Sequence, residues 1–349
     1  NLYRLGGDEF VIIINDRGQE GADEYAANIL AGLKEPFKLG DSMLHINISI
    51  GASIYPDQGR DANELLRCAD IAMYKAKEAG GNRYMLYMPS MNDIILERML
   101  IEKYLHLALE KNELELYYQP QFDLIENRIT GFEALLRWNS RELGAVSPIK
   151  FIKIAEETHL IIPLGTWVMK EACAFMKKLQ EQGKFDITIA VNISILQILQ
   201  DNFIDFIFGV LGFYNLEPQN LELEITETIL MESFEVITDK LNLLNGKGIK
   251  IALDDFGKGY SSLSYLKQLP ITTLKIDKSF IDYISTEQRN RSLTGQIVKI
   301  GKSMGLSVVA EGVETKEQLD YLILNHCQKI QGYLFSKPLP ESEVWHLLS

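Results

Sequence analysis

The fold is decided by stretches such as residues 249–255, Ile-Lys-Ile-Ala-Leu-Asp-Asp, in which a short apolar run ends in two carboxylates. Seven further short runs end in side chains that can bind a metal or a phosphate, and helix-length segments separate most of them. The side chains at these ends are Gln119, Glu133, Asn192, Glu224, Lys275 with Asp277, Glu311 and Gln331. Active-site groups sit at the carboxyl ends of the strands in a (β/α)8 barrel. The spacing therefore predicts an α/β protein with a TIM-like (β/α)8 barrel.

The barrel elements are predicted to fill residues 113–349. Right-handed crossovers make a closed parallel barrel the simplest arrangement of these strands and helices. The predicted helices span residues 149–156, 163–182, 195–215, 233–247, 261–267, 289–304, 316–325 and 341–348.

Residues 1–90 predict a smaller, partial α+β domain. A hairpin is predicted over residues 2–14, because the glycine pair Gly6-Gly7 permits a tight turn. The chain begins within the first strand of this hairpin, which indicates a domain cut at that point. Further elements are predicted as a helix at 22–33, a strand at 45–55, a helix at 61–79, a strand at 84–88 and a connecting helix within 91–112.

Charge and composition narrow the classes of partner. The formal net charge is −13, which argues against a broad basic surface for a DNA or RNA duplex. Apolar residues make up 46% of the chain, enough for a large core, but no apolar run reaches the roughly 18 residues that cross a bilayer. Cys68, Cys173 and Cys327 are far apart and predict buried thiols in a reducing compartment. We therefore expect a cytoplasmic protein, with the alternative that the chain is the cytosolic part of a longer, membrane-anchored sensor.

The acidic strand ends predict a metal-dependent enzyme. Carboxylates that converge on one mouth repel each other unless divalent cations join them. Each residue alone has a simpler explanation: Glu133 as a solvated charge, Asn192 as a helix cap, and Lys275 as the partner of Asp277. Their joint placement at successive strand ends favours the metal site.

Motifs along the chain resemble those of EAL-domain cyclic di-GMP phosphodiesterases. Residues 133–138, Glu-Ala-Leu-Leu-Arg-Trp, are similar to the signature of that family, and the resemblance runs from about residue 97 to the C-terminus. The other matching motifs are Tyr118-Gln119-Pro120, Val191-Asn192-Ile193-Ser194, Glu224-Ile225-Thr226-Glu227, Asp254-Asp255-Phe256-Gly257, Lys275-Ile276-Asp277, Ala310-Glu311-Gly312-Val313-Glu314 and Gln331-Gly332-Tyr333. Residues 6–10, Gly-Gly-Asp-Glu-Phe, resemble the second half of a GGDEF domain.

The resemblance implies a role for each matching side chain. Two divalent ions, Mg²⁺ or Mn²⁺, suit the oxygen donors better than zinc does. The implied metal ligands are Glu133, Asn192, Glu224, Asp254, Asp255 and Glu311. The implied catalytic residues are Glu133, Asp255, Lys275 and Glu311. The implied substrate contacts are Gln119, Arg137, Asp277 and Gln331.

The loop after Asp255, residues 256–263, resembles a glycine-containing lid of the family. Glu227 and Glu314 are implied to have loop-stabilising roles. Lys258 stands where threonine is common, which leaves the regulation of the loop open but removes no metal ligand. Glu222 alternates with Glu224, so we predict that it shares the same face nearer the core, in a structural role.

The GGDEF-like part is predicted to be a vestigial site in this chain. Its matching residues are Gly6, Gly7, Asp8, Glu9 and Lys77. Gly81 replaces an arginine that is common in the family, and the preceding half of the domain lies outside the chain. We therefore expect no synthesis of cyclic di-GMP by this chain, and GTP only as a ligand of a complete GGDEF domain in a longer protein.

The predicted function is hydrolysis of cyclic di-GMP to 5′-pGpG by a two-metal phosphodiesterase mechanism, in bacterial second-messenger signalling. The alternatives are a cyclic di-GMP receptor that does not hydrolyse its ligand, an unrelated barrel hydrolase of another phosphodiester, and a bifunctional GGDEF–EAL protein in its full-length form. Receptors of this type usually lack one or more metal ligands, whereas none is missing here. The family also implies a homodimer.

Overall fold

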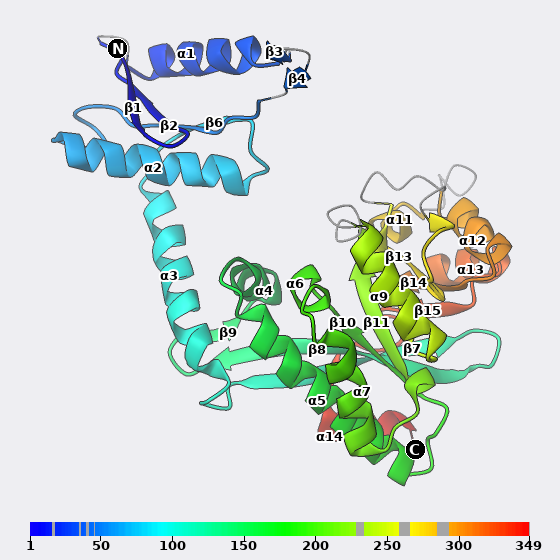
Figure 1. The fold of residues 1–349 in the computed structure, drawn as a ribbon. Helices are drawn as coiled ribbons and strands as arrows, with labels where there is room; N and C mark the ends of the chain where they lie inside the picture. The colour runs from blue at the N-terminus through cyan, green and yellow to red at the C-terminus, as the bar shows by residue number, and fades with distance from the viewer. Residues whose placement is uncertain are drawn as a thin grey trace. The chain divides into compact units, whose positions relative to one another are not determined.

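The computed structural model describes residues 1–15, 18–34, 36–39, 42–44, 46–227, 234–257, 266–284 and 293–348. The chain divides into two compact units, residues 1–100 and 101–349 (Figure 1). Helix α3, Ser90–Ala108, crosses the division between them.

The first unit contains the predicted hairpin and both predicted helices. Strands β1 (Leu2–Gly6) and β2 (Glu9–Ile12) pair antiparallel, and Gly7 in their turn has a φ of +54°. The strand predicted at 45–55 is shorter than expected, since only Ile50–Ala52 forms β5, which pairs with β6. The remaining elements are α1 (Gly18–Gly32), β3 (Phe37–Leu39), β4 (Ser42–Leu44), α2 (Ala62–Glu78) and β6 (Tyr84–Leu86).

The second unit is a closed barrel of eight strands, which confirms the predicted TIM-like fold (Figure 1). Seven of its strands run parallel in the order β8, β10, β11, β12, β13, β14 and β15, and β7 closes the sheet between β8 and β15. The bounds are β7 (Leu114–Asp123), β8 (Arg128–Ser140), β10 (Thr188–Asn192), β11 (Leu221–Thr226), β12 (Lys250–Phe256), β13 (Thr273–Ile276), β14 (Ser307–Glu311) and β15 (Lys329–Gln331). Two short strands, β9 (Gly144–Val146) and β16 (Leu339–Pro340), extend the sheet outside the barrel.

Strand β7 departs from the predicted all-parallel barrel. It runs antiparallel to both of its neighbours in the barrel, β8 and β15. Only a short turn joins β7 to β8, and a turn of this length can reverse the chain but cannot make the long crossover that a parallel pair needs. The prediction of parallel strands was therefore wrong for β7. Gln119 and Glu133 lie opposite each other within β7 and β8, not at the ends of these strands as predicted.

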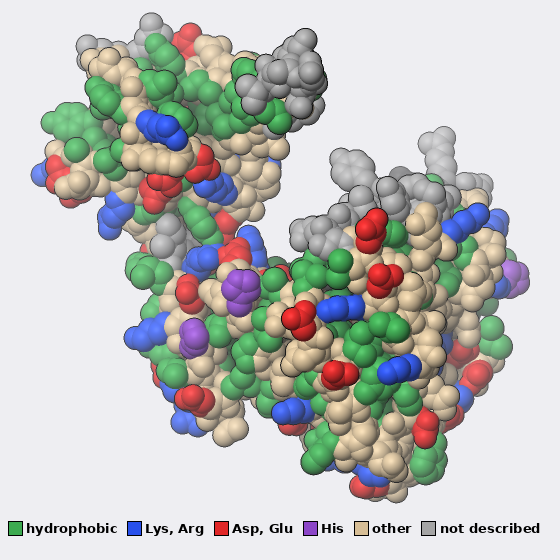
Figure 2. Space-filling model, viewed as in Figure 1, with side chains coloured by type: hydrophobic (Ala, Val, Ile, Leu, Met, Phe, Trp, Pro, Cys, Tyr) green, Lys and Arg blue, Asp and Glu red, His purple; other side chains and the backbone are tan. Residues whose placement is uncertain are grey.

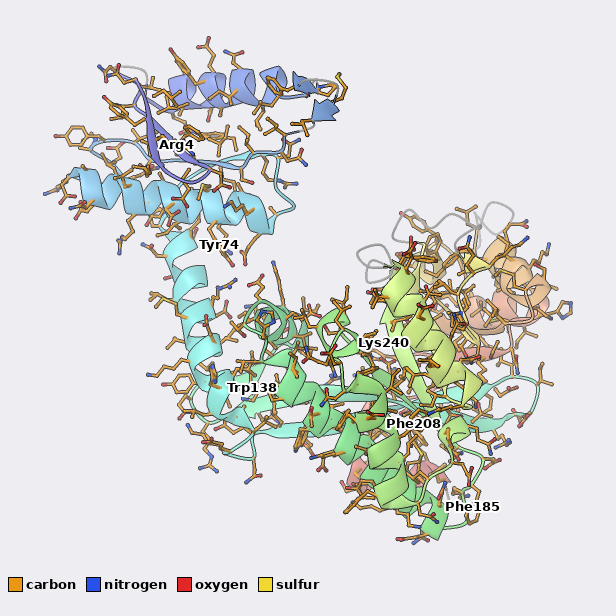
Figure 3. All side chains as sticks on the ribbon, viewed as in Figure 1. Arg4, Tyr74, Trp138, Phe185, Phe208 and Lys240 are labelled. Carbon is orange, nitrogen blue, oxygen red and sulfur yellow. The ribbon has the colours of Figure 1, made fainter. Side chains whose placement is uncertain are left out.

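The helices of this unit agree with the predicted positions in most places. The helix predicted at 195–215 is two helices, α6 and α7, and the carbonyl groups exposed by the break accept hydrogen bonds from Lys240 Nζ (Figure 3). Most of the helix predicted at 261–267 lies outside the described residues. The observed helices are α4 (Pro148–Glu157), α5 (Ile161–Glu181), α6 (Ile195–Ile198), α7 (Phe203–Tyr214), η1 (Pro218–Asn220), α9 (Phe234–Gly246), α11 (Lys278–Asp282), α12 (Thr294–Ser303), α13 (Lys316–Leu324) and α14 (Glu341–Leu348).

The strands separate an apolar outer face from a polar interior. Successive side chains of a strand point to opposite faces of a sheet. On β11, Leu221, Leu223 and Ile225 join the apolar core with the surrounding helices, whereas Glu222 and Glu224 between them are also buried. The interior of the barrel is therefore lined by polar side chains, and the helices pack on its outside.

Aromatic side chains anchor the helices to the outer face of the barrel. Phe175 on α5 is 1% exposed and stacks on Tyr118 of β7, with ring centroids 3.9 Å apart. The same ring lies 5.7 Å from that of Trp345 on α14. A second cluster contains the buried Trp138, whose ring meets Phe151 edge-on (Figure 3). These contacts connect elements that are far apart in the sequence.

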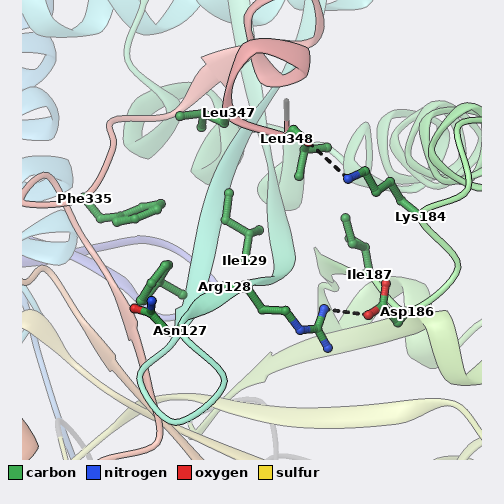
Figure 4. A pocket seen from close by; sticks show the side chains of 10 residues that line it. Asn127, Arg128, Ile129, Lys184, Asp186, Ile187, Phe335, Leu347 and Leu348 are labelled. Atoms are coloured by element: carbon green, nitrogen blue, oxygen red, sulfur yellow. Dashed lines mark hydrogen bonds and ion pairs between the residues drawn. The ribbon is translucent and has the colours of Figure 1, made fainter.

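A surface hollow lies beside the amino ends of β8 and β10 (Figure 4). Its two cationic side chains are already bound within the protein. Arg128 forms an ion pair with Asp186 at 2.6 Å, and Lys184 Nζ donates to the Leu348 carbonyl at 3.1 Å. The hollow is at the end of the barrel opposite the carboxyl ends of the strands, so it is not the site that the sequence predicts.

One face of the molecule carries both acidic and basic side chains. Acidic and basic side chains are interspersed over the barrel unit on the face drawn in Figure 2. Among the helices that the structure describes, none combines the length and the apolar character needed to cross a bilayer.

Replacement of Phe175 by alanine tests the packing of α5 on the barrel. Phe175→Ala should lower the free energy of unfolding by about 3–5 kcal/mol, because the cavity left by a buried aromatic ring closes only in part. Urea denaturation followed by circular dichroism gives this value. The control is Phe213→Ala on α7, whose side chain is 82% exposed. Equal effects of the two substitutions would contradict the packing described here.

Candidate active site

The ammonium group of Lys275 lies at the centre of the carboxyl ends of the barrel strands. Lys275 is 1% exposed. Its Nζ lies 2.6 Å from Glu224 and 2.7 Å from Glu311, and 3.4 Å from both Glu133 and Asp254. These carboxylates come from β11, β14, β8 and β12, so the barrel brings four distant segments of the chain to one cation.

The register of the strands arranges the predicted residues in two layers. In a TIM barrel the side chains of one layer come from alternate strands. The deeper layer contains Glu133, Glu224, Lys275 and Gln331, from β8, β11, β13 and β15. The layer nearer the mouth contains Gln119, Asn192, Asp254 and Glu311, from β7, β10, β12 and β14. The structure thus brings together eight of the residues that the sequence predicts for the site.

Two amides donate to the carboxylate of Glu133, and a third bonds to one of them. Asn192 Nδ2 donates to Glu133 Oε1 at 2.7 Å, and Gln331 Nε2 donates to Glu133 Oε2 at 2.5 Å. Gln331 Nε2 also donates to Gln119 Oε1 at 3.1 Å. Because Gln119 lies opposite Glu133 in the β7–β8 register, the reversed strand completes this network.

The electrostatics of the site reflect one cation among several buried anions. Burial would raise the pKa of Glu133, but the charge of Lys275 and the amide hydrogen bonds hold it below its usual value. Burial and the neighbouring charge of Glu133 raise the pKa of Glu224 well above its usual value. Burial likewise raises the pKa of Asp254, and that of Glu311 to about 8.

Lys275 opposes the electrostatic repulsion among the buried carboxylates. Burial alone would lower the pKa of Lys275, but the charges of the surrounding carboxylates raise it well above its usual value. A fully ionised set of four carboxylates and one ammonium carries a net charge of −3, from four negative charges and one positive charge. The site therefore has an excess of negative charge that the side chains themselves do not neutralise.

The oxygen atoms of the converging side chains are suitable ligands for divalent cations. All of the converging anionic donors are oxygens, and Glu224 Oε1 is buried without a hydrogen-bond partner among the described residues. Within the same residues, no three His, Cys, Asp or Glu side chains converge on a common point that could hold a metal, because the carboxylates are turned toward Lys275. The unpaired oxygen and the excess charge are the two observations that fit oxygen-binding cations.

Asp255 occupies a special backbone position at the start of the following loop. Its φ is +56°, in the left-handed region, and its backbone N–H donates to Asp254 Oδ1 at 2.8 Å. Glu227 Oε2 accepts a hydrogen bond from the N–H of Gly257 at 3.3 Å, which supports the predicted role of Glu227 in holding the loop. The loop beyond Gly257, with Lys258, lies outside the described residues.

The other predicted residues lie around the mouth, and their roles stay predictions. The Arg137 guanidinium lies over the ring of Tyr117, 5.6 Å from its centroid, and burial lowers the pKa of Arg137. Asp277 caps α11 by accepting a hydrogen bond from the Ser279 backbone N–H at 2.9 Å. Glu314 pairs with Lys278 at 3.1 Å, which connects the segment after β14 to α11.

The GGDEF-like residues all lie in the first unit. Gly6, Gly7, Asp8 and Glu9 form the exposed turn between β1 and β2, and Lys77 is exposed in the last turn of α2. Arg4 donates two hydrogen bonds to the carbonyl of Gly7. Their vestigial role stays a prediction.

The sequence analysis did not identify Thr273. Its hydroxyl donates to Glu222 Oε1, so Glu222 has a partner in the interior, on the face that the sequence predicts. The alternation Thr273-Leu274-Lys275 places Thr273 on the face of Lys275, and this was the available signal. The contact itself joins residues far apart in sequence, and no local pattern reveals it.

Comparison with known families agrees with this geometry. Residues 102–338 match the sequence model described as "EAL domain". The chain belongs to the EAL domain family. Residues 1–83 match a second model, "Diguanylate cyclase, GGDEF domain".

The EAL chain also resembles known proteins along nearly its whole length. It is 42% identical to the signaling protein YkoW of Bacillus subtilis over 98% of this chain and 43% of the relative. It is 38% identical to the bifunctional diguanylate cyclase/cyclic di-GMP phosphodiesterase MucR of Pseudomonas aeruginosa, over 98% of this chain and 50% of the relative. The chain thus spans about half the length, or less, of these curated relatives.

A solved structure shares the fold of the EAL unit. It is described as "PaMucR Phosphodiesterase, c-di-GMP complex" and is 38% identical to this chain, with a TM-score of 0.67. The match covers 70% of this chain and 99% of that one.

Removal of the Lys275 ammonium should destabilise the protein most at high pH. Lys275→Met leaves four carboxylates without their shared cation, which raises their pKa values in the folded state above those in the unfolded state. Stability is then lost as pH rises through the interval between the unfolded and the folded pKa values. We expect a loss of about 3–5 kcal/mol at pH 8 in the presence of a chelator, and a smaller loss at pH 5.5.

Urea denaturation at the two pH values measures this difference. The control is Lys178→Met, which breaks an exposed ion pair with Glu341 and should cost about 1 kcal/mol or less. If Lys275→Met loses more stability relative to wild type at pH 5.5 than at pH 8, the arrangement described here is wrong.

Proposed function

We propose that the EAL domain of this chain hydrolyses cyclic di-GMP to 5′-pGpG. The observation that carries this proposal is the convergence of four carboxylates on the buried Lys275 at the carboxyl ends of the barrel strands. Membership of the EAL family and the likeness to a phosphodiesterase whose structure is described as a c-di-GMP complex support the choice of substrate.

The reaction is an in-line displacement at one phosphorus of the cyclic dinucleotide. An oxygen of water forms a bond to phosphorus, the bond from phosphorus to the ribose 3′-oxygen breaks, and the leaving oxygen takes up a proton. Two divalent cations, Mg²⁺ or Mn²⁺, would supply activation of water and neutralisation of phosphoryl charge when bound. The residues proposed to hold them are Glu133, Asn192, Glu224, Asp254, Asp255 and Glu311.

The side chains of this protein bind and orient the substrate. Lys275 keeps its proton, because the surrounding carboxylates raise its pKa, and so it places a fixed positive charge beside the reacting phosphate. Arg137 offers a planar guanidinium that matches paired phosphate oxygens. Gln119 and Gln331, whose amides already form a chain to Glu133, offer polar contacts to the nucleotide. Asp277, at the mouth, completes the proposed substrate contacts.

The surroundings of the reaction belong to the same proposal. We place it in the cytoplasm, where the three buried free cysteines would stay reduced. A homodimer is the proposed assembly. GTP is proposed as a ligand only of a complete GGDEF domain in a longer protein, which would then be bifunctional, as the relative MucR is described to be.

The second candidate is a receptor that binds cyclic di-GMP without hydrolysis. The excess of negative charge around Lys275 favours the enzyme, because a receptor does not need a cluster of carboxylates beside an anionic ligand. Binding of cyclic di-GMP without any product after long incubation with Mn²⁺ would favour the receptor.

Replacement of Glu133 should abolish the reaction. Glu133→Ala removes a carboxylate that contacts Lys275 and accepts hydrogen bonds from the amides of Asn192 and Gln331. We therefore expect kcat to fall by about 1,000-fold or more. Chromatographic separation of cyclic di-GMP and pGpG measures the rate. The control is Glu181→Ala at the exposed end of α5, which should keep the wild-type rate. Wild-type turnover by Glu133→Ala would refute the assignment.

Metal removal provides an independent test. Hydrolysis should stop when a chelator is added and return when Mg²⁺ or Mn²⁺ is supplied in excess, because the oxygen donors carry a charge that only bound cations neutralise. Full activity after exhaustive chelation, checked by elemental analysis of the protein, would rule out the two-metal mechanism.

A further inference from the structure

Further polar side chains lie in the barrel interior, below the two layers of the active site. The interior of a TIM barrel is usually filled by branched apolar side chains. Here Glu222 on β11 and Thr273 on β13 are each 4% exposed, and they precede Glu224 and Lys275 by two residues on the same strands. Because side chains alternate along a strand, each pair shares the interior face, and the members are about 6–7 Å apart along the strand.

Two hydrogen bonds cross the barrel interior below the active site. The Thr273 hydroxyl donates to Glu222 Oε1, and Lys250 Nζ donates to Thr188 Oγ1 at 2.8 Å. The first bond joins β13 to β11 and passes over β12, and the second joins β12 to β10 and passes over β11. Each bond therefore joins side chains of two strands that are not direct neighbours, across a strand whose backbone pairs with both.

The bond between Thr273 and Glu222 joins the same two strands as the contact between Lys275 and Glu224. That contact, at 2.6 Å, is the shortest of the four around the ammonium. Strand β12 between them has only the small side chain of Ala252 in register with both Glu224 and Thr273. Backbone pairing with β12 sets the separation of β11 and β13, and the small Ala252 side chain leaves room for the Thr273 hydroxyl to reach Glu222 across β12.

Stability alone does not account for this pair. A buried carboxylate loses its hydration, and a well-packed apolar pair of the same shape is often neutral or more stable. Lys250, the register partner of Glu222, supplies a nearby positive charge but donates its own hydrogen bond to Thr188. What the polar pair adds beyond packing is a directional bond, which fixes a distance.

We propose that Thr273 and Glu222 are positioning residues: their hydrogen bond fixes how the inward side chains of β11 and β13 lie against each other, and with it the place of the Lys275 ammonium beside Glu224. This inference rests on the proposed phosphodiesterase function for its kinetic test. Thr273 and Glu222 thereby influence the reaction through the position of Lys275, without contact with the substrate.

The kinetic test replaces the hydroxyl without a change of shape. Thr273→Val should lower kcat by about 10- to 100-fold with KM within about twofold of wild type, because small displacements of reacting groups are costly in rate and not in binding. Thr273→Ser restores the hydroxyl and should recover kcat. The matched control is Ser307→Ala, since Ser307 is the register partner of Thr273 and its buried hydroxyl has no hydrogen-bond partner among the described residues.

A double variant separates positioning from folding. Glu222→Leu combined with Thr273→Val removes both buried polar groups, so its melting temperature should recover relative to Thr273→Val alone. The inference requires that kcat stay low in this double variant. A kcat that returns together with the melting temperature would show a structural role only and would overturn the inference, as would a wild-type kcat in Thr273→Val.

Metal affinity keeps this test separate from the test of the proposed function. A wild-type protein that forms no pGpG contradicts the proposed function. Titration calorimetry with Mn²⁺ alone then decides the inference, with an expected loss of affinity of about tenfold or more in Thr273→Val and none in Ser307→Ala. Equal Mn²⁺ affinity of wild type and Thr273→Val overturns it.

Discussion

The burial of one ammonium group among four carboxylates is the constraint on which the EAL unit depends. Lys275 comes from the middle of the barrel and contacts carboxylates from four other strands. A lysine that is 1% exposed keeps its charge only because these anions replace its hydration. The anions in turn outnumber it, and burial together with their mutual repulsion raises the pKa values of Glu224, Asp254 and Glu311. This excess of negative charge destabilises the site when no cation is bound, and it suits the site to bind cations from solution.

The barrel accommodates this polar centre by placing polar side chains in its interior, where a TIM barrel usually has branched apolar ones. Inward residues of β11 and β13 are charged or polar, and the outward residues are apolar and pack against helices. The stability of the unit therefore comes from the outer shell, where rings such as Phe175 and Tyr118 join α5 to β7. The interior is free to hold groups that a purely structural core would exclude, and the strands carry them to fixed positions.

Strand β7 shows how a local departure from the regular barrel serves the site. Because β7 runs antiparallel to β8, Gln119 lies opposite Glu133 and reaches it through Gln331. In a regular β/α repeat this position would need a helix between the two strands. The hairpin places an amide in the upper layer with only a short turn, and its outward residue Tyr118 still joins the core.

The sequence by itself determined the barrel, the order of its strands and the set of polar residues at their ends. It could do so because alternation along a strand and the spacing of strand–helix repeats are local, and each apolar run led to a polar residue. Only the tertiary structure decided that β7 is reversed, that Lys275 pairs with Glu224 and Glu311 while Asp277 caps α11, and that Thr273 holds Glu222. The contacts of Lys275 and Thr273 depend on which strands come together in the barrel, and contacts between residues so far apart in the chain leave no periodic trace in it.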